Sequence, residues 1–159
     1  MKKIIFLLFA FIISNLLFAQ QNASTDLATQ EEAVKAVVKK FLTAAGNYDI
    51  DAMPALFTEN ANIAGASFKN EKWNTYNVTL VEFMAMLRLE TNPTKYTEPV
   101  SKFIVHMSEG KLAFVKADAT LIFDGKAQRH NFDYFTLIKG TSGWKIVNGS
   151  YVSTPIKKN

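Results

Sequence analysis

The hydrophobic and polar residues of the C-terminal third alternate in a way that predicts antiparallel strands. The expected strands are Ser101–Ser108, Lys111–Phe123, Lys126–Lys139 and Trp144–Val152. Short polar or glycine-containing segments separate them, and one of these is Asp124-Gly125. Asp-Gly between two alternating runs is a strong hairpin signal, because a type I′ turn needs positive φ at both central residues. We therefore expect one sheet built from consecutive hairpins.

Three stretches before this sheet have the periodicity or the capping residues of helices. Residues 30–45 place an apolar side chain every three or four positions, and Thr29 can cap the helix that this pattern predicts. A second, short helix is expected at residues 53–57. A third is expected at residues 80–87, after a capping box that begins at Thr79.

The remaining segments connect these elements. Residues 61–68 are a candidate strand, residues 69–77 a loop or a short extended stretch, and residues 89–99 a connection. No internal repeat or linker divides the chain. We therefore expect an α+β fold of one domain, residues 29–159, in which the three helices cover one face of the sheet.

The N-terminal residues 1–19 have the pattern of a secretory signal peptide. Lys2 and Lys3 precede an apolar run at residues 4–18, and small Ala19 is followed by polar residues. We expect cleavage after Ala19, export to the periplasm or the exterior, and a disordered leader at residues 20–28. The alternative is a membrane anchor, for which this apolar run is short.

The charge and the cysteine content exclude several classes of site. The formal net charge is +4 for the full chain and +2 without Lys2 and Lys3, so nucleic acid is not an expected partner. The absence of cysteine excludes disulfides, thiol catalysis and thiolate metal sites. Two histidines without clustered carboxylates do not favour a metal centre, and no phosphate-loop or serine-nucleophile motif is present. We expect no metal and no cofactor.

The predicted hairpin register defines a candidate pocket. If the Asp124-Gly125 turn pairs its strands residue for residue, Lys116 faces Asp133 across one face of the sheet. That face then combines an apolar floor with a few polar groups, which is the usual composition of a small-molecule pocket. The candidate ligand-binding residues on this face are Asp133, Lys116, Phe135, Asn148, Asn131 and Asp118.

The other face of the predicted sheet is too apolar to be left in water. No helix remains to cover it, because all three are needed on the concave side. We therefore expect a two-fold homodimer. Its predicted interface consists of Val115, Ala117, Phe132, Tyr134 and Tyr151.

The order of these elements resembles the nuclear transport factor 2-like superfamily, which includes the SnoaL-like proteins. Residues 47–53 are similar to the superfamily's entry to its second helix, and His130–Lys139 followed by Gly143–Asn148 is similar to the C-terminal signature of the putative lumazine-binding branch. The resemblance covers about residues 31–152. It implies a cone-shaped, curved antiparallel sheet with helices on its concave face and pairing of two copies through their sheets. To the candidate pocket residues it adds Tyr48, Phe41 and Phe57.

The resemblance also bears on catalysis. Ketosteroid isomerase has this fold and an Asp-x-Phe-x-Phe strand whose Asp enters the pocket, and Asp133 begins a similar segment here. Counted from Asp49, the isomerase's oxyanion Tyr and general-base Asp fall on Phe41 and Gly65, which can neither donate nor accept a proton. An isomerase of that mechanism is therefore not expected.

A dehydratase of the scytalone type is a second comparison, because Tyr48-Asp49 resembles its helix-entry pair. The simpler role for Asp49 is that of a helix N-cap. Such a mechanism also needs a histidine in the pocket, but the predicted register puts His130 on the face away from Asp133.

Three functions remain open. The leading one is an exported, non-catalytic domain that binds an unidentified small molecule. The second is a dehydratase-like lyase or isomerase using Asp133 with Lys116, Tyr48 or Asp49, which a strongly raised pKa of Asp133 would favour. The third is a dimeric interaction module with a vestigial pocket, which a cavity filled by phenylalanine side chains would favour.

Overall fold

The computed structural model of the chain describes residues 26–157. The chain divides into residues 1–32 and 33–159, and the fold described below is that of the second unit. The predicted signal peptide and most of the predicted leader lie outside the described residues. Within residues 26–157, no helix is long and apolar enough to span a membrane.

The first helix runs through residues 26–47 of the described chain. Residues 26–28 are therefore helical, not part of a disordered leader, and Thr29 lies inside the helix instead of capping it. The side chain of Gln30 donates a hydrogen bond of 3.3 Å to Asp26 one turn earlier. Such pairs four residues apart stabilise a helix, which explains its extension beyond the predicted start.

The second predicted helix is a pair of short 3-10 turns, η1 (Ile50–Ala52) and η2 (Pro54–Leu56). The carboxylate of Asp49 accepts a hydrogen bond from the backbone N–H of Ala52, so the N-cap role of Asp49 is confirmed. The third helix is α2 (Leu80–Arg88), and its reciprocal capping box between Thr79 and Glu82 is also confirmed.

Six strands form one curved, open sheet in the order β2-β1-β6-β5-β4-β3. Among the strands of residues 26–157, β1 and β6 pair in parallel and the other neighbours are antiparallel. The segment predicted as a loop or extended stretch is mostly strand, and the four C-terminal strands are confirmed. The strands are β1 (Phe57–Lys69), β2 (Lys72–Thr79), β3 (Val100–Ser108), β4 (Leu112–Phe123), β5 (Lys126–Gly140) and β6 (Gly143–Pro155).

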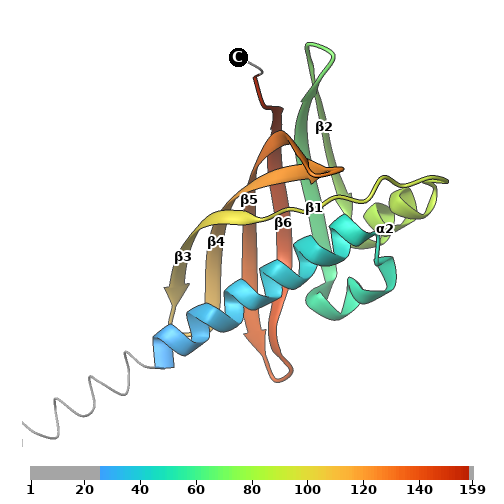
Figure 1. The fold of residues 1–159 in the computed structure, drawn as a ribbon. Coiled ribbons are helices and arrows are strands. Elements are labelled where there is room, and N and C mark those ends of the chain that lie inside the picture. The colour runs from blue at the N-terminus through green and yellow to red at the C-terminus, as the bar shows by residue number, and fades with distance from the viewer. Residues whose placement is uncertain (1–25, 158–159) are drawn as a thin grey trace, which may run out of the picture. The chain divides into compact units, whose positions relative to one another are not determined.

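Residues 33–47 of the first helix lie across the inner face of the sheet (Figure 1). Their apolar side chains and those of the sheet form one buried core. Its fully buried large side chains are Met53, Leu137, Ile146, Val34 and Val38. The predicted α+β architecture, a curved sheet with three helices on its concave side, is confirmed.

The β4–β5 hairpin begins as predicted but does not keep its register. Asp124 and Gly125 have φ of 50° and 72°, as a type I′ turn requires, and Phe123 lies opposite Lys126. Between Leu121 and Ile122 of β4 the register shifts, so that Leu121 pairs with Arg129. Gln128 is the extra residue, and a bulge of this kind displaces every later pair by one position.

This shift reverses which β4 side chains share a face of the sheet with a given β5 side chain. Asp133 lies opposite Ala117, and Lys116 lies opposite Tyr134. Because a displacement of one residue moves a side chain to the other face, Asp133 faces the helices and Lys116 faces away from them. The predicted contact between Lys116 and Asp133 is therefore wrong.

This shift and a second one, between β5 and β6, redistribute the predicted dimer face. Val115 and Ala117 are buried on the inner face, and Tyr151, opposite Asp133, lies on that face as well. Only Phe132 and Tyr134 are exposed on the outer face. The five residues predicted as one interface thus lie on two sides of the sheet.

Candidate functional site

A cavity of about 250 Å³, here called the inner cavity, lies between the first helix, α2 and the inner face of the sheet. Apolar side chains such as Phe41, Leu42, Ile63 and Phe135 form much of its wall. Polar side chains face it as well. These are Tyr76, Tyr96, Glu98, Arg129, Asn131, Asp133, Tyr151, Ser67 and Ser153.

A single strand, β5, supplies a row of side chains to the wall of the inner cavity. Arg129, Asn131, Asp133 and Phe135 are alternate residues of β5, so they share its inner face, and all four line the cavity. Along this strand the cavity therefore meets a cation, an amide, a carboxyl group and an aromatic ring in turn.

Asp133 and Glu98 form a pair of buried carboxyl groups joined by a side-chain hydrogen bond. Burial, followed by the charge of Glu98, raises the pKa of Asp133 to about 8. Burial also raises the pKa of Glu98, to about 7, against the opposing hydrogen bonds from Asn131 and Asp133. Two carboxyl groups in such contact titrate as one unit, and near neutral pH the pair retains a proton.

Two acceptor oxygens beside this proton lack a hydrogen-bond partner among the described residues. The side-chain amide of Asn131 donates a hydrogen bond of 2.7 Å to Glu98. Its own oxygen Oδ1, and Oδ2 of Asp133, are buried without a hydrogen-bond partner among the described residues. Buried polar atoms are nearly always partnered in folded proteins. This pair of acceptors in a cavity wall is therefore a feature that a bound ligand would satisfy.

A close approach of backbone at Gly46 brings Glu98 to the cavity. The N–H of Tyr96 donates a 3.0 Å hydrogen bond to the carbonyl of Gly46. A Cβ atom on residue 46 would lie 2.4 Å from the carbonyl oxygen of Tyr96, so a larger residue does not fit. Thr97 then pairs with Ile122 at the end of β4, which holds the following Glu98 beside the inner face.

Two tyrosines meet over Gly65 on another wall of the cavity. The hydroxyl of Tyr76 donates a hydrogen bond of 3.3 Å to that of Tyr151. Burial raises the pKa of Tyr76 far above its ordinary value, so its hydroxyl stays protonated. A Cβ atom on residue 65 would lie 2.6 Å from the Tyr76 ring and 2.8 Å from the Tyr151 ring. The glycine that replaces a catalytic base in the comparison with ketosteroid isomerase thus makes room for this hydroxyl pair.

Four of the predicted pocket residues line the inner cavity: Asp133, Asn131, Phe135 and Phe41. Phe57 packs behind Phe41 in the core, with ring centroids 5.0 Å apart, and does not line the cavity. Tyr48 follows the first helix with φ of 57° and also lies outside the cavity wall.

The other three predicted pocket residues lie on the outer face. Lys116 and Asp118 form an ion pair of 2.6 Å, and the Lys116 ammonium lies 5.0 Å from the centroid of the Phe132 ring. Asn148 donates a hydrogen bond of 3.1 Å to Asn62. The bulge in β5 accounts for the first two. A second register shift, between β5 and β6, moves Asn148 to the outer face.

Sequence reasoning missed the other polar residues of the cavity. Arg129 lies four residues before Asp133 in the same strand, so strand alternation alone predicts that the two side chains share a face. Tyr76 lies in a segment that was predicted as loop or extended. Glu98 lies in a connection between two prolines, and no local pattern marks it as inward-facing.

Comparison with known proteins agrees with this architecture. The model of the family described as putative lumazine-binding matches residues 29–152. No curated protein matches the chain significantly. Within residues 26–157, no group of three or more side chains could hold a metal ion.

Many solved structures share the fold. A nuclear transport factor 2-like protein with a cystatin-like fold from Novosphingobium aromaticivorans is 14% identical, with 82% of this chain and 85% of that chain covered and a TM-score of 0.65. A protein with a cystatin-like fold from Nostoc punctiforme is 12% identical, with 77% and 90% covered and a TM-score of 0.63. A nuclear transport factor 2-like protein from Shewanella baltica is 16% identical, with 81% and 97% covered and a TM-score of 0.60. At these identities the likeness shows the fold alone.

The buried carboxyl pair predicts an unusual dependence of stability on pH. Both pKa values are higher in the folded chain than in the unfolded chain, so the folded chain binds more protons between about pH 4 and pH 8. We predict that the free energy of unfolding, measured with urea, falls between about pH 5 and pH 8.5, by an amount on the order of a few kcal/mol. Asp133→Asn cannot ionise and should remove most of this fall.

A matched substitution provides the control. Asp51 is an exposed carboxylate that pairs with Arg88 at 3.1 Å, and Asp51→Asn should keep the pH dependence of the wild type. A wild-type free energy of unfolding that is constant or rises over this range would show that the pair does not hold a proton.

Proposed function

This chain belongs to the family described as putative lumazine-binding, and we propose that its inner cavity binds a small planar heterocycle without converting it. The observation that carries the proposal is the proton-holding pair of Asp133 and Glu98, with unpartnered acceptors at Asp133 Oδ2 and Asn131 Oδ1, in a mostly apolar cavity. A few convergent polar groups within apolar walls are typical of ligand sites.

Lumazine itself illustrates the chemistry that fits. It is a fused two-ring pteridine whose edge alternates N–H and carbonyl groups. The proton of the carboxyl pair lies in the hydrogen bond between the two groups, so Asp133 Oδ2 can accept from one ring N–H of such a ligand and Asn131 Oδ1 from another. The inner cavity, about 250 Å³, lies just below the roughly 300–1,000 Å³ of drug-sized sites, which suits a fused ring system.

A second candidate function is that of a lyase or isomerase. The raised pKa of Asp133 favours it, because a carboxyl group that titrates near neutral pH can act as a general acid or base. Its partner in that role would be Glu98, since Lys116, Tyr48 and Asp49 do not line the inner cavity. The Tyr76–Tyr151 hydroxyl pair could then donate to a substrate oxygen.

The vestigial-pocket alternative has less support. Phe41 packs edge to face against Phe57 and Phe135, with ring centroids 5.0 Å and 5.8 Å apart. Phe41 and Phe135 line the cavity, and about 250 Å³ remains beside their rings. Export remains part of the proposal, on the pattern of residues 1–19.

We predict that wild-type protein binds lumazine, and that Asp133→Leu weakens this binding by about tenfold or more, because it removes a hydrogen-bonding group from the cavity. The matched control is Lys116→Leu, which introduces the same side chain on the outer face. Fluorescence titration measures the affinity, and chromatography of the recovered ligand tests for conversion. Equal effects of the two substitutions would contradict the placement of the site, and a converted ligand would favour the second candidate function.

We also propose a homodimer, now built on the outer patch. This patch runs along β4 and β5, where four large side chains are between 38% and 50% exposed: Phe114, Phe132, Tyr134 and Ile138. Contiguous apolar surface of this kind usually marks an interaction site. The superfamily resemblance, which implies pairing of copies through their sheets, supports the same face.

The double substitution Phe132→Glu and Tyr134→Glu should convert a dimer into a monomer, because it places two charges in an apolar interface. The matched control is Val81→Glu with Met86→Glu, at exposed apolar positions of α2, which should stay dimeric. Light scattering at micromolar concentration measures the mass. A monomeric wild type would refute the homodimer.

A further inference from the structure

We propose that Arg129 makes one end of the inner cavity a carboxylate-binding subsite, so that the ligand is a planar ring system carrying a carboxylate group. This inference rests on the proposed function, because it names the charge of the ligand that the same cavity binds. Arg129 is half-buried and lines the cavity together with Ser67 and Ser153.

One edge of the Arg129 guanidinium is fixed by neutral oxygen atoms. Its Nε donates a hydrogen bond of 2.8 Å to Ser153 Oγ. Its Nη2 donates at 2.9 Å to Ser67 Oγ and to the carbonyl oxygens of Phe68 and Ser153. These bonds hold the side chain between the ends of β1, β5 and β6, so the position of the charge is set before any ligand arrives.

Within the described part of the chain, the remaining donors and the charge of Arg129 have no partner. Among residues 26–157, Nη1 has no hydrogen-bond partner, and no carboxylate forms an ion pair with Arg129. Arg129 is also not among the groups that shift the pKa of Asp133 or Glu98. A partly desolvated cation is normally matched by an anion.

A purely structural clamp would not need these features. Joining the three strand ends requires only Nε and Nη2, and a neutral donor could satisfy two serine hydroxyls and two carbonyls. The unpaired charge and the spare Nη1 donors at a cavity wall are what a ligand anion would use. A single free nitrogen suits one carboxylate oxygen, whereas a phosphate dianion calls for more donors.

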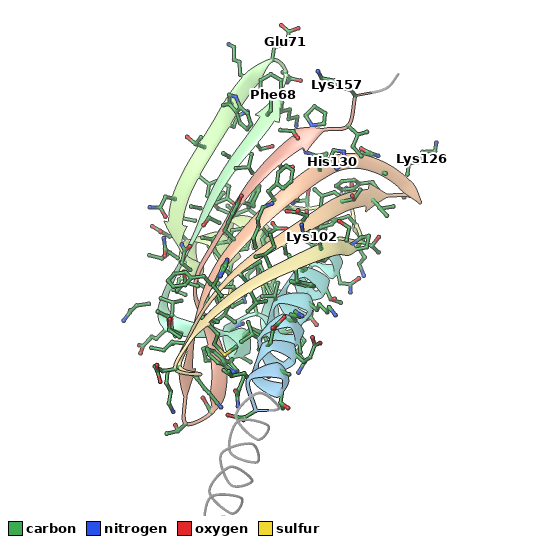
Figure 2. All side chains as sticks on the ribbon, turned by 90° about the vertical axis from the view of Figure 1, so that its left-hand side faces the viewer. Phe68, Glu71, Lys102, Lys126, His130 and Lys157 are labelled. Atoms are coloured by element: carbon green, nitrogen blue, oxygen red, sulfur yellow. The ribbon has the colours of Figure 1, made fainter. Side chains whose placement is uncertain are left out.

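The subsite lies at the end of the sheet that the first helix does not cover. Residue 129 is near the start of β5, next to His130, and it contacts Ser67 and Phe68 at the end of β1. Figure 2 shows Phe68 and His130 toward the same end of the sheet, beyond the first helix. At about 3.3 Å per residue, the Cα atoms of Arg129 and Asp133 are roughly 13 Å apart along the strand. A ligand can therefore place its ring edge at the carboxyl pair and its carboxylate toward Arg129.

Two probes that differ only in charge test the subsite. They are 2-naphthoate and its neutral isostere 2-naphthamide, and calorimetric titration measures their affinities for the full chain. We expect wild-type protein to bind naphthoate about 10- to 100-fold more tightly than naphthamide, since a hydrogen bond to a charged group contributes that much. Arg129→Gln should abolish this preference, and Arg129→Lys should retain part of it.

The control is Lys126→Gln, which removes an exposed cation from the same hairpin and should keep the naphthoate preference. Equal affinity of the wild type for the two probes overturns the carboxylate subsite, and so does a preference that survives in Arg129→Gln. Should Arg129→Gln not fold, the wild-type comparison alone decides between these outcomes. If naphthamide and lumazine bind without any advantage for naphthoate, only the subsite is refuted, whereas failure of all three probes to bind refutes the proposed function as well.

Discussion

The register of β5 against β4 determines which side chains reach the inner cavity. The hairpin starts from a tight Asp124-Gly125 turn, and a single bulged residue, Gln128, then displaces all later pairs by one position. Small or β-branched residues of β4, such as Ala117 and Val115, consequently face the helices beside Asp133. The bulge also leaves Lys116 and the large rings of Phe132 and Tyr134 on the outer face. Core, cavity and outer patch therefore depend on this bulge, together with the second register shift between β5 and β6.

The buried carboxyl pair is the feature of this arrangement that reduces the stability of the fold. Burial disfavours the charged forms of Asp133 and Glu98, and their proximity adds repulsion, which is why both pKa values rise. An apolar pair at these positions would pack without such a cost. Positions that break the rule of apolar cores without evident structural gain are those where function is expected. The cavity is thus best understood as a polar site held inside an apolar shell.

Local patterns in the sequence were sufficient for most elements of the fold, but not for β2 or for the start of the first helix. The capping box at Thr79, the N-cap at Asp49 and the turn at Asp124 each depend on neighbouring residues, and each is found as predicted.

The site depends on contacts that such patterns do not encode. No residue near Gln128 signals the bulge, so the predicted pairing placed Lys116 in the pocket. Gly46 has no side chain, so the connection that precedes Glu98 can approach the first helix there. This approach brings Glu98 to Asp133. Arg129 could have been predicted from the sequence. It lies two residues before Asn131 and four before Asp133, so strand alternation places all three on the same face.

The central claim is that Asp133 and Glu98 share a proton at neutral pH. Carbon-13 nuclear magnetic resonance of the side-chain carboxyl groups tests it most directly, with Asp133→Asn and Glu98→Gln assigning the two signals. The account predicts that in the wild type these two carboxyl groups titrate together, well above the ordinary carboxyl range of about 4, and that one of them is still protonated near pH 7. Two independent titrations completed below about pH 5 would contradict it.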